Sequence, residues 1–422
     1  MNRRQRPACS TSRTKRGIRA IPPRPLYSTA AMVSHSAPIN AAVLRWASKR
    51  RGLSLAGLRK TLRVSEAEIG AWEQGTTHPP YAKAQQLAKA LRIPFGFLFL
   101  SAPPPDDVPL PDLRTRRDRP PEAPSPDLLE VINDALRRQE WYREQAEETG
   151  MTPLPFIRKY SMTSGASTVA DNMRNILRVT EDVRRSCNSL ESYLTRLTRN
   201  AELAGILVMR SGVVKHDTSR ALSADEFQGF ALCDDLAPVI FINVQDAVAA
   251  RIFTFAHEAA HLWIGESGIS APSRITDKVS WSDAAMIERF CHSVAAELLV
   301  PRMELWELWP QNGGTALDLA GQFARHFWVS RIVVLRRAFD LNLIDRSEFF
   351  AAVEQVKRHE RSPKKAEGGN PYFTIPARNS ARLTDSVLGA LRERRLVHTD
   401  AGALLAISQP TLLKLARKRI GA

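Results

Sequence analysis

The segment from Phe255 to His261, which reads Phe-Ala-His-Glu-Ala-Ala-His, constrains the fold of this 422-residue chain more than any other. Side chains four positions apart project from the same face of an α-helix, so His257 and His261 can reach one metal ion only if this stretch is helical. Glu258 would then point toward the open coordination position. Zinc held by neutral imidazoles lowers the pKa of a bound water toward ~7, and a neighbouring carboxylate can take the proton. The spacing predicts His257 and His261 as Zn²⁺ ligands and Glu258 as general base.

A catalytic zinc site usually takes three protein ligands, so a third donor must come from elsewhere in the chain. The apolar pattern over residues 286–300 predicts a second buried helix, ended by Pro301. Two of its residues, Glu288 and Glu297, are candidate ligands, and they are nine positions apart. At about 100° per residue they lie on opposite faces of the helix, so only one can reach the metal.

The two segments "HEAAH" and "ERFCHSVAAELLVP" resemble the motifs of the ImmA/IrrE-type zinc metallopeptidases. The resemblance implies that Glu288, at the start of the second motif, completes the zinc site and that Glu297 is structural. This family usually has an asparagine where the chain has His292, which lies four residues after Glu288 and on the same helix face. His292 is therefore a candidate fourth ligand or a hydrogen-bond donor to the ligands.

Other acidic residues leave the choice of third ligand open on sequence grounds. Glu266, Asp277 and Asp283 lie between the two motifs and could replace Glu288 if the second helix is placed differently. The spacing in the family favours Glu288.

Two short apolar strands precede the zinc helix. Residues 229–243 contain two apolar segments on either side of an Asp-Asp turn, as in a β-hairpin, and the ImmA/IrrE-type family has a similar hairpin at this place. An edge strand beside the zinc helix could hold a substrate segment by strand addition. Val239–Asn243 is a candidate for that role, and a core strand that only supports the helix fits the pattern equally well.

Composition restricts the class of protein further. No apolar run reaches the ~18 residues that a membrane span needs, so we expect a cytoplasmic protein with no membrane partner. The four cysteines lie far apart, which suits a reducing compartment. The net charge of +16 and the isoelectric point of about 10.1 make nucleic acid a plausible partner.

The region from residue 39 to 101 has the pattern of five short helices. Ser54 and Ser65 are typical N-caps, and Gly75 is a typical stop. The stretch "LSLAGLRKTLRVSEAEIGAWEQG" resembles the second and third helices of the Cro/repressor (XRE)-type helix-turn-helix family. The resemblance implies that the third helix enters the major groove of double-stranded DNA. The candidate DNA contacts are Ser65, Glu66, Glu68, Gly70 and Thr76.

Two of these candidates complicate the DNA-binding interpretation. Glu66 and Glu68 would be repelled by phosphate unless they accept from a cytosine amino group. A domain of this shape can equally bind a protein partner or form a homodimer.

These signals predict a mainly α protein with a small mixed β-sheet (α+β), built from an all-α helix-turn-helix bundle, a zincin-like metallopeptidase domain and C-terminal helical modules. We expect a disordered basic extension (1–38), the helix-turn-helix domain (39–101), a Pro-rich linker (102–126), the metallopeptidase domain (127–310), a helical module (311–358), a linker (359–369) and a C-terminal helical module (370–422).

The resemblance implies a cytoplasmic zinc-dependent endopeptidase that cleaves or inactivates a regulatory protein. Its setting would be stress response, mobile-element control or toxin-antitoxin pairing, and its substrate is expected to be a repressor or other regulator. One alternative is a DNA-binding transcriptional regulator with a structural or sensory zinc site and no peptidase activity. The other is an antitoxin-like binding module.

Overall fold

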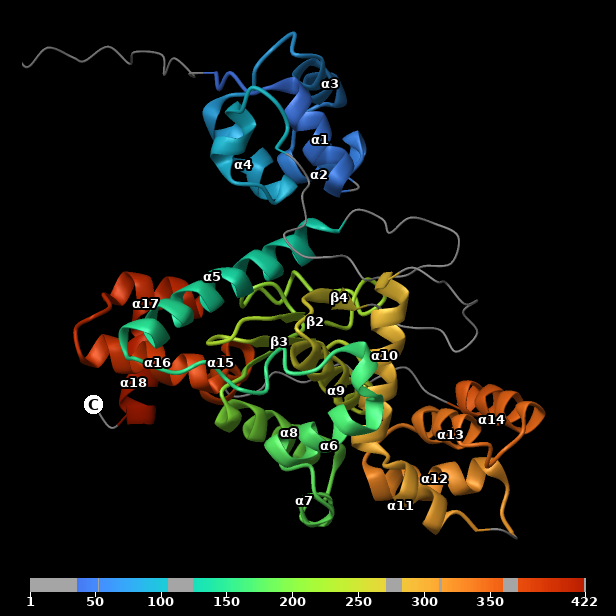
Figure 1. The fold of residues 1–422 in the computed structure, drawn as a ribbon. Helices are drawn as coiled ribbons and strands as arrows, with labels where there is room; N and C mark the ends of the chain where they lie inside the picture. The colour runs from blue at the N-terminus through green and yellow to red at the C-terminus, as the bar shows by residue number, and fades with distance from the viewer. Residues whose placement is uncertain are drawn as a thin grey trace, which may run out of the picture. The chain divides into compact units, whose positions relative to one another are not determined.

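The computed structural model describes residues 36–51, 53–104, 124–270, 283–310, 313–359 and 371–420. It divides the chain into two compact units, residues 1–104 and 105–422. The described residues are mainly helical with one four-stranded sheet, which confirms the predicted fold class (Figure 1). Most of the predicted basic extension and of both predicted linkers lies outside the described residues. No described helix is both long enough and apolar enough to cross a membrane.

The first unit is a bundle of short helices around one apolar core. They are α1 (Ala41–Arg51), α2 (Leu55–Leu62), α3 (Glu66–Gln74), α4 (Tyr81–Leu91) and the 3-10 helix η1 (Phe95–Phe99). Leu44, Leu58, Ile69, Trp72 and Leu87 are buried in the core. These apolar residues recur at helical spacing in the sequence, so each helix has one apolar face. The bundle forms because the helices bury these faces against one another.

The sheet of the second unit contains β1 (Leu207–Ser211), β2 (Gly229–Leu232), β3 (Val239–Asn243) and β4 (Gly268–Ser270). Its strand order is β1-β3-β2-β4, with β3 parallel to β1 and antiparallel to β2. The hairpin predicted around the Asp-Asp turn is therefore present as β2 and β3. Because β3 is paired on both sides, it is a core strand and has no edge for a substrate segment.

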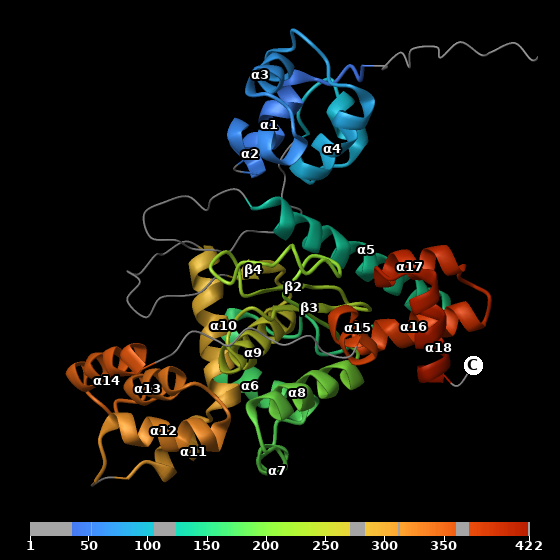
Figure 2. The ribbon, with the colours of Figure 1, turned by 180° about the vertical axis from the view of Figure 1, so that it is seen from behind.

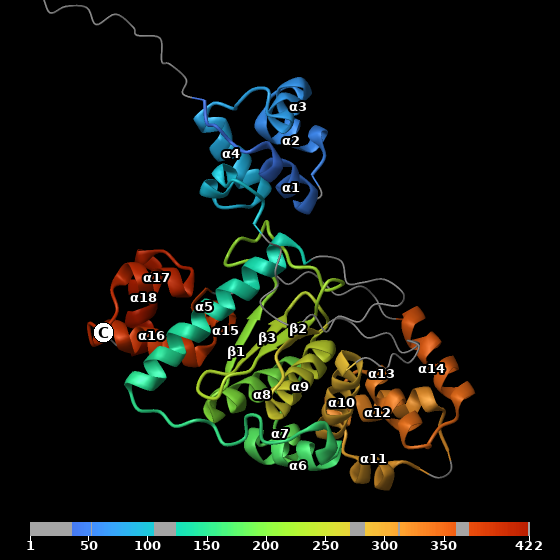
Figure 3. The same cartoon turned by 45° about the horizontal axis from the view of Figure 1, so that its top comes forward.

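The two faces of the sheet contact different helices, because successive strand residues point to opposite sides. On one face, Val208, Ala231 and Ile240 pack against α9 (Val248–Ile264) and its neighbours. On the other face, Leu207, Met209, Phe230 and Val239 pack against α5 (Pro126–Glu148) and the C-terminal helices. The sheet is thus the middle layer of three (Figures 1 and 3).

Further helices complete the two outer layers. On the side of α9 lie η2 (Met162–Ser164), α6 (Ala166–Leu177), α7 (Glu181–Arg185), α8 (Leu190–Ala204) and α10 (Asp283–Leu299). After α10 come α11 (Arg302–Leu308), α12 (Ala316–Phe327), α13 (Arg331–Asp340) and α14 (Arg346–His359). The chain ends with α15 (Pro371–Asn379), α16 (Ala381–Arg392), α17 (His398–Leu405) and α18 (Gln409–Ile420), on the side of α5 (Figure 2).

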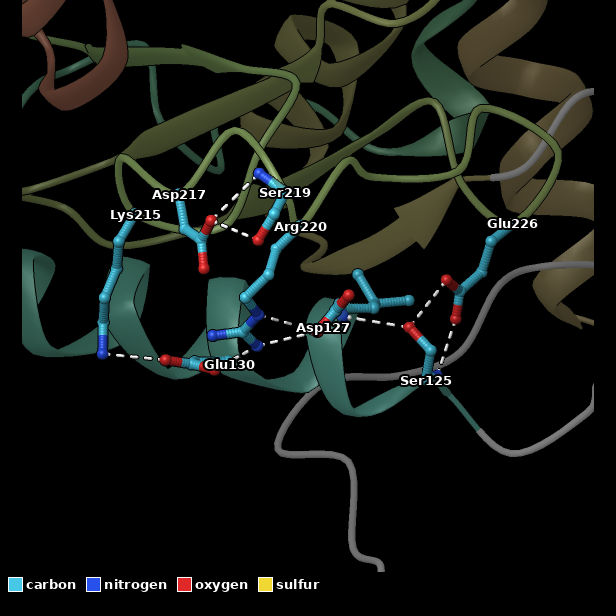
Figure 4. A network of polar contacts seen from close by, with 9 residues as sticks. Ser125, Asp127, Glu130, Lys215, Asp217, Ser219, Arg220 and Glu226 are labelled. Atoms are coloured by element: carbon cyan, nitrogen blue, oxygen red, sulfur yellow. Dashed lines mark hydrogen bonds and ion pairs between the residues drawn. The ribbon is translucent and has the colours of Figure 1, made fainter. Parts of the chain in front are cut away.

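A polar network fixes the start of α5 against the loop between β1 and β2 (Figure 4). The backbone N–H and the hydroxyl of Ser125, the N-cap of α5, both donate to the carboxylate of Glu226, at 2.7 and 2.8 Å. Arg220 bridges Asp127 and Glu130 from the same loop, at 2.7 and 2.5 Å. These contacts hold α5 across the sheet and so keep the layer order.

Candidate metal centre

The helix α9 places the HEAAH motif inside the second unit. His257 is 3% exposed, and Glu258 and His261 are fully buried. The helix ends at Gly265, whose φ of 81° suits glycine, and the indole N–H of Trp263 donates to Asn172 on α6 at 2.9 Å. The end of the helix is therefore held in place one turn beyond the second histidine.

The helix α10 brings Glu288 against both imidazoles. Glu288 Oε2 lies 3.3 Å from His257 Nε2, and Glu288 Oε1 lies 3.2 Å from His261 Nε2. The two Nε2 atoms are 3.1 Å apart. Donors of a tetrahedral zinc with bonds of about 2.0–2.1 Å lie about 3.3 Å from one another, so the three side chains fit such an ion.

The charge states of these groups also suit a metal. Burial lowers the pKa of His257, which favours the neutral imidazole that binds metals. Burial alone would raise the pKa of Glu288, but the two imidazoles beside it lower that pKa well below its usual range. The cluster therefore offers two imidazole nitrogens and one carboxylate, which is a common donor set for zinc.

His292 lies beside the same cluster. Its Nδ1–H donates to the backbone carbonyl of Glu288 at 2.7 Å, because a carbonyl can only accept. Its ring centroid lies 4.4 Å from that of His257. Burial lowers the pKa of His292 to about 4, so the ring is neutral and its Nε2 carries a lone pair. Ligand atoms of His257, Glu288 and His292 all lie within 4.8 Å of one another.

The other acidic candidates stand apart from this cluster. Glu297 pairs with Arg337 on α13 and accepts from the backbone N–H of Arg302 at 3.1 Å. Glu266 and Asp283 belong to no group of potential metal ligands within the described residues. Asp277 lies outside those residues.

Gly229 is a further residue of the site that the sequence interpretation did not single out. A Cβ at this position would lie 2.7 Å from the carbonyl oxygen of Phe241, 2.7 Å from Thr254 Cγ2 and 2.9 Å from Glu258 Oε1. The start of β2 therefore lies directly against the carboxylate of Glu258, and only glycine allows this approach. A glycine at the start of an apolar strand was the available signal in the sequence.

The predicted DNA contacts of the first unit lie on or next to α3. Ser65 and Glu68 form a capping box: the backbone N–H and the hydroxyl of Ser65 donate to Glu68 Oε2 at 2.8 and 2.7 Å. The Thr76 hydroxyl donates to the carbonyl of Ala71 at 3.1 Å. Glu66 is exposed, 3.8 Å from Arg59. A Cβ on Gly70 would meet no atom within 4 Å.

These contacts change what the residues around α3 can do. Glu68 and Ser65 satisfy each other and the start of α3, so their first role is to form the helix. The acidic side chains that complicated the DNA-binding interpretation are thus partly explained by helix capping.

A buried His-Glu-x-x-His helix with a carboxylate from a second helix and a small sheet beside it defines a metallopeptidase-type domain. In agreement, residues 201–339 match the family model of the IrrE N-terminal-like domain, a metallopeptidase family, and residues 44–98 match a helix-turn-helix family model. The chain therefore joins an XRE-type helix-turn-helix domain to an IrrE N-terminal-like domain, as the sequence motifs indicated. No curated protein and no solved structure matches it.

Proposed function

We propose that this protein is a zinc-dependent endopeptidase of the cytoplasm, with His257, His261 and Glu288 as metal ligands. The observation that carries the proposal is the separation of 3.1–3.3 Å between the two Nε2 atoms, and between each of them and one of the two carboxylate oxygens of Glu288, in three buried side chains. Three ligands leave one position for water, as a catalytic zinc requires.

The residues around the metal divide the work of peptide hydrolysis. A zinc ion bound here would supply Lewis acidity toward water and the substrate carbonyl. Glu258 is the general base: its carboxylate accepts a proton from the attacking water and returns it to the leaving amine nitrogen. Gly229 positions that carboxylate by letting the β2 backbone pack against it.

An extended substrate segment is best accommodated at β4. In the described sheet β4 pairs only with β2, and Gly229 of β2 lies opposite Ser270 of β4. The opposite edge of the sheet, β1, is covered by α15. Strand addition at β4 would place the substrate backbone on the side of the sheet nearest Gly229 and Glu258. In an added strand, only every second backbone N–H faces β4. Methylation of those N–H groups in a substrate peptide should weaken binding, whereas methylation of the N–H groups between them should not. Equal binding of the two sets of methylated peptides would contradict this placement.

The substrate that this architecture supports best is a regulatory protein, such as a repressor acting in stress response, mobile-element control or toxin-antitoxin pairing. The support is the covalent link to a helix-turn-helix domain, which implies double-stranded DNA as a further partner. A homodimer stays a prediction.

The decisive experiment replaces the general base and keeps the ligands. Glu258→Gln should retain stoichiometric zinc and lose cleavage of a regulator encoded beside this protein. His257→Ala is the matched control, and it should lose both zinc and cleavage. Retained cleavage in Glu258→Gln would refute the assignment.

His292 supports a second candidate function, a regulator with a closed structural or sensory zinc site. Its Nε2 carries a lone pair and belongs to the same cluster as His257 and Glu288, so it could occupy the fourth position. His292→Asn separates the two functions. A ligand role predicts that zinc affinity in chelator competition falls by more than about 100-fold, whereas a position beside an open catalytic site predicts a loss of about 10–100-fold at most.

A further inference from the structure

The C-terminal pair α17–α18 repeats the backbone of the α2–α3 pair. Both α2 and α17 have eight residues and end at a left-handed residue, Arg63 with φ 53° and ψ 52° and Ala406 with φ 54° and ψ 38°. In both pairs one apolar residue and one serine then precede the second helix: Val64 and Ser65, or Ile407 and Ser408. This is the turn of a helix-turn-helix motif.

The core positions of the two pairs also correspond at one constant offset along the sequence. The corresponding buried residues are Leu58 and Ala401, Leu62 and Leu405, Ile69 and Leu412, and Trp72 and Leu415. The same positions therefore anchor the second helix in each pair. The face of α18 that points away from this core therefore corresponds to the outward face of α3.

The helix α16 packs against the α17–α18 pair, and all three helices share an apolar core with α5 and the sheet. Leu383, Val387 and Leu388 of α16 share one core with Leu412 and Leu415. The last carbonyls of α17 accept four side-chain hydrogen bonds from outside the motif: Arg137 donates to Ala403 at 3.5 Å, Arg138 to Leu404 at 2.8 Å, and His216 and Asn379 to Leu405 at 3.1 and 3.0 Å.

The two second helices carry opposite charges. The α3 helix contains three glutamates and no basic residue, whereas α18 contains four basic residues and no acidic one. The four are Lys414, Arg417, Lys418 and Arg419. Arg419 forms a bidentate ion pair with Asp385 on α16, which joins α18 to the unit.

The exposed face of α18 combines polar, apolar and basic side chains. At about 100° per residue, five exposed residues fall within about 140° of the helix circumference, opposite Leu412 and Leu415. They are Gln409, Pro410, Leu413, Lys414 and Arg417. Among the described residues, Lys414 and Arg417 have no ion-pair partner, so their charges are available to an anionic ligand.

A third pair, α12–α13, has a similar turn, with a left-handed Trp328 and an N-cap at Ser330. Two of the three arginines of α13 are already engaged within the chain. Arg337 pairs with Glu297, and Arg336 pairs with Asp340 at 3.0 Å. This pair is therefore better explained as a packing module, and α18 is the stronger candidate.

We propose that α17 and α18 form a second DNA-binding helix-turn-helix, with α18 in the major groove of double-stranded DNA and Lys414 and Arg417 on backbone phosphates. In helix-turn-helix motifs the exposed face of the second helix is the one that enters the groove, and the positive charge of that face in α18 complements phosphate. The deep, narrow major groove of A-form RNA does not admit such a helix. Leu413, 41% exposed on the same face, is placed to contact a thymine methyl group.

The test uses the full chain and a double charge reversal. Lys414→Glu/Arg417→Glu should weaken binding to a random-sequence DNA duplex at least tenfold at about 50 mM salt, measured by fluorescence anisotropy. The slope of log affinity against log salt should become shallower by about 2, since each phosphate contact contributes about 0.9.

The matched control is Arg196→Glu/Arg199→Glu on the exposed face of α8. It has the same helical spacing and removes the same positive charge, so it separates a local contact from the effect of net charge. Binding by the control should stay within about twofold of the unmodified protein.

Lys414→Gln/Arg417→Gln keeps the experiment decisive if the charge reversal does not fold, and it should show an intermediate loss at an unchanged thermal melting curve. Equal losses in the α18 and α8 variants would overturn the proposal. So would unchanged duplex binding in the α18 variants, or an equal preference for double-stranded RNA.

Discussion

The metal centre and the surface of α3 show two ways in which polar side chains are placed in this protein. At the metal centre, His257, His261, Glu258 and Glu288 are buried among apolar side chains, where ionisable groups are costly unless they have partners. On α3, Ser65 and Glu68 are exposed and bonded to each other. The buried cluster therefore indicates chemistry by its position alone, whereas the exposed residues are sufficiently explained by helix formation.

The largest expected effect comes from metal. If the buried cluster binds zinc, a free zinc concentration about 1,000 times Kd should raise the free energy of unfolding of the second unit by about 4 kcal/mol, because only the folded site binds. The first unit should be unaffected. Calorimetry with and without a chelator would show the unfolding transitions of both units. A zinc-dependent shift of both transitions, or of neither, would contradict a metal site confined to the second unit.

A smaller effect is expected from filling the space at Gly229. Gly229→Ala should lower the free energy of unfolding by about 1–3 kcal/mol, because the new methyl group overlaps Phe241, Thr254 and Glu258. Gly70→Ala on α3 is the matched control. There the added methyl group meets nothing, and helix propensity should stabilise the first unit by about 0.5–1 kcal/mol.

Equal effects of these two glycine substitutions in urea unfolding would contradict the description of Gly229 as a close-approach site. A further readout is hydrolysis itself. Gly229→Ala should reduce kcat more than it changes KM, because it displaces Glu258 rather than the substrate.

Removal of the capping box is expected to cost less. Ser65→Ala should lower the stability of the first unit by about 1 kcal/mol, because the start of α3 loses its side-chain acceptor. Zinc content and hydrolysis should not change. Ser54→Ala at the start of α2, where a single bond of 3.3 Å is lost, should cost less than Ser65→Ala, and the opposite order would speak against the capping box.

The smallest effect concerns pH. The backbone N–H of Ser65 and then its hydroxyl lower the pKa of the exposed Glu68 below its usual 4.5. The folded first unit therefore binds fewer protons than the unfolded chain, so this contribution to stability is present above pH 4.5 and is lost as the pH falls through the lowered pKa. Glu68→Gln should flatten the dependence, and an unchanged slope in acid unfolding of the first unit would exclude Glu68 as its origin.

Local signals were enough to predict the elements of the site. The four-residue spacing of His257 and His261 requires a helix, and the apolar pattern before Pro301 requires another. That Glu288 rather than Glu297 meets the histidines depends on how the two helices pack, so residue spacing left the choice open and only the family resemblance favoured Glu288. Gly229 was missed for the same reason, since a close approach between a strand and a helix has no local signature beyond the glycine itself.

The position of β3 shows the same limit. Its apolar run fitted an edge strand or a core strand, and only its parallel pairing with β1, across a long connection, decides that it is central. The C-terminal unit shows the reverse case. The sequence contains the pattern of its turn, because Leu405-Ala406-Ile407-Ser408 parallels Leu62-Arg63-Val64-Ser65. Which of its basic residues face solvent could be decided only from the packing of α18.

Three of the hydrogen bonds that hold the end of α17 have a mechanical consequence. Arg138 belongs to α5, His216 to the loop after β1 and Asn379 to α15, so the last turn of α17 is braced from three directions. A duplex bound to α18 could not rotate freely relative to the candidate metal centre. If α18 binds DNA and the His257–Glu288 cluster is hydrolytic, as proposed above, docking on DNA would hold that cluster in one fixed orientation relative to the nucleic acid, and only proteins bound within its reach would be exposed to cleavage.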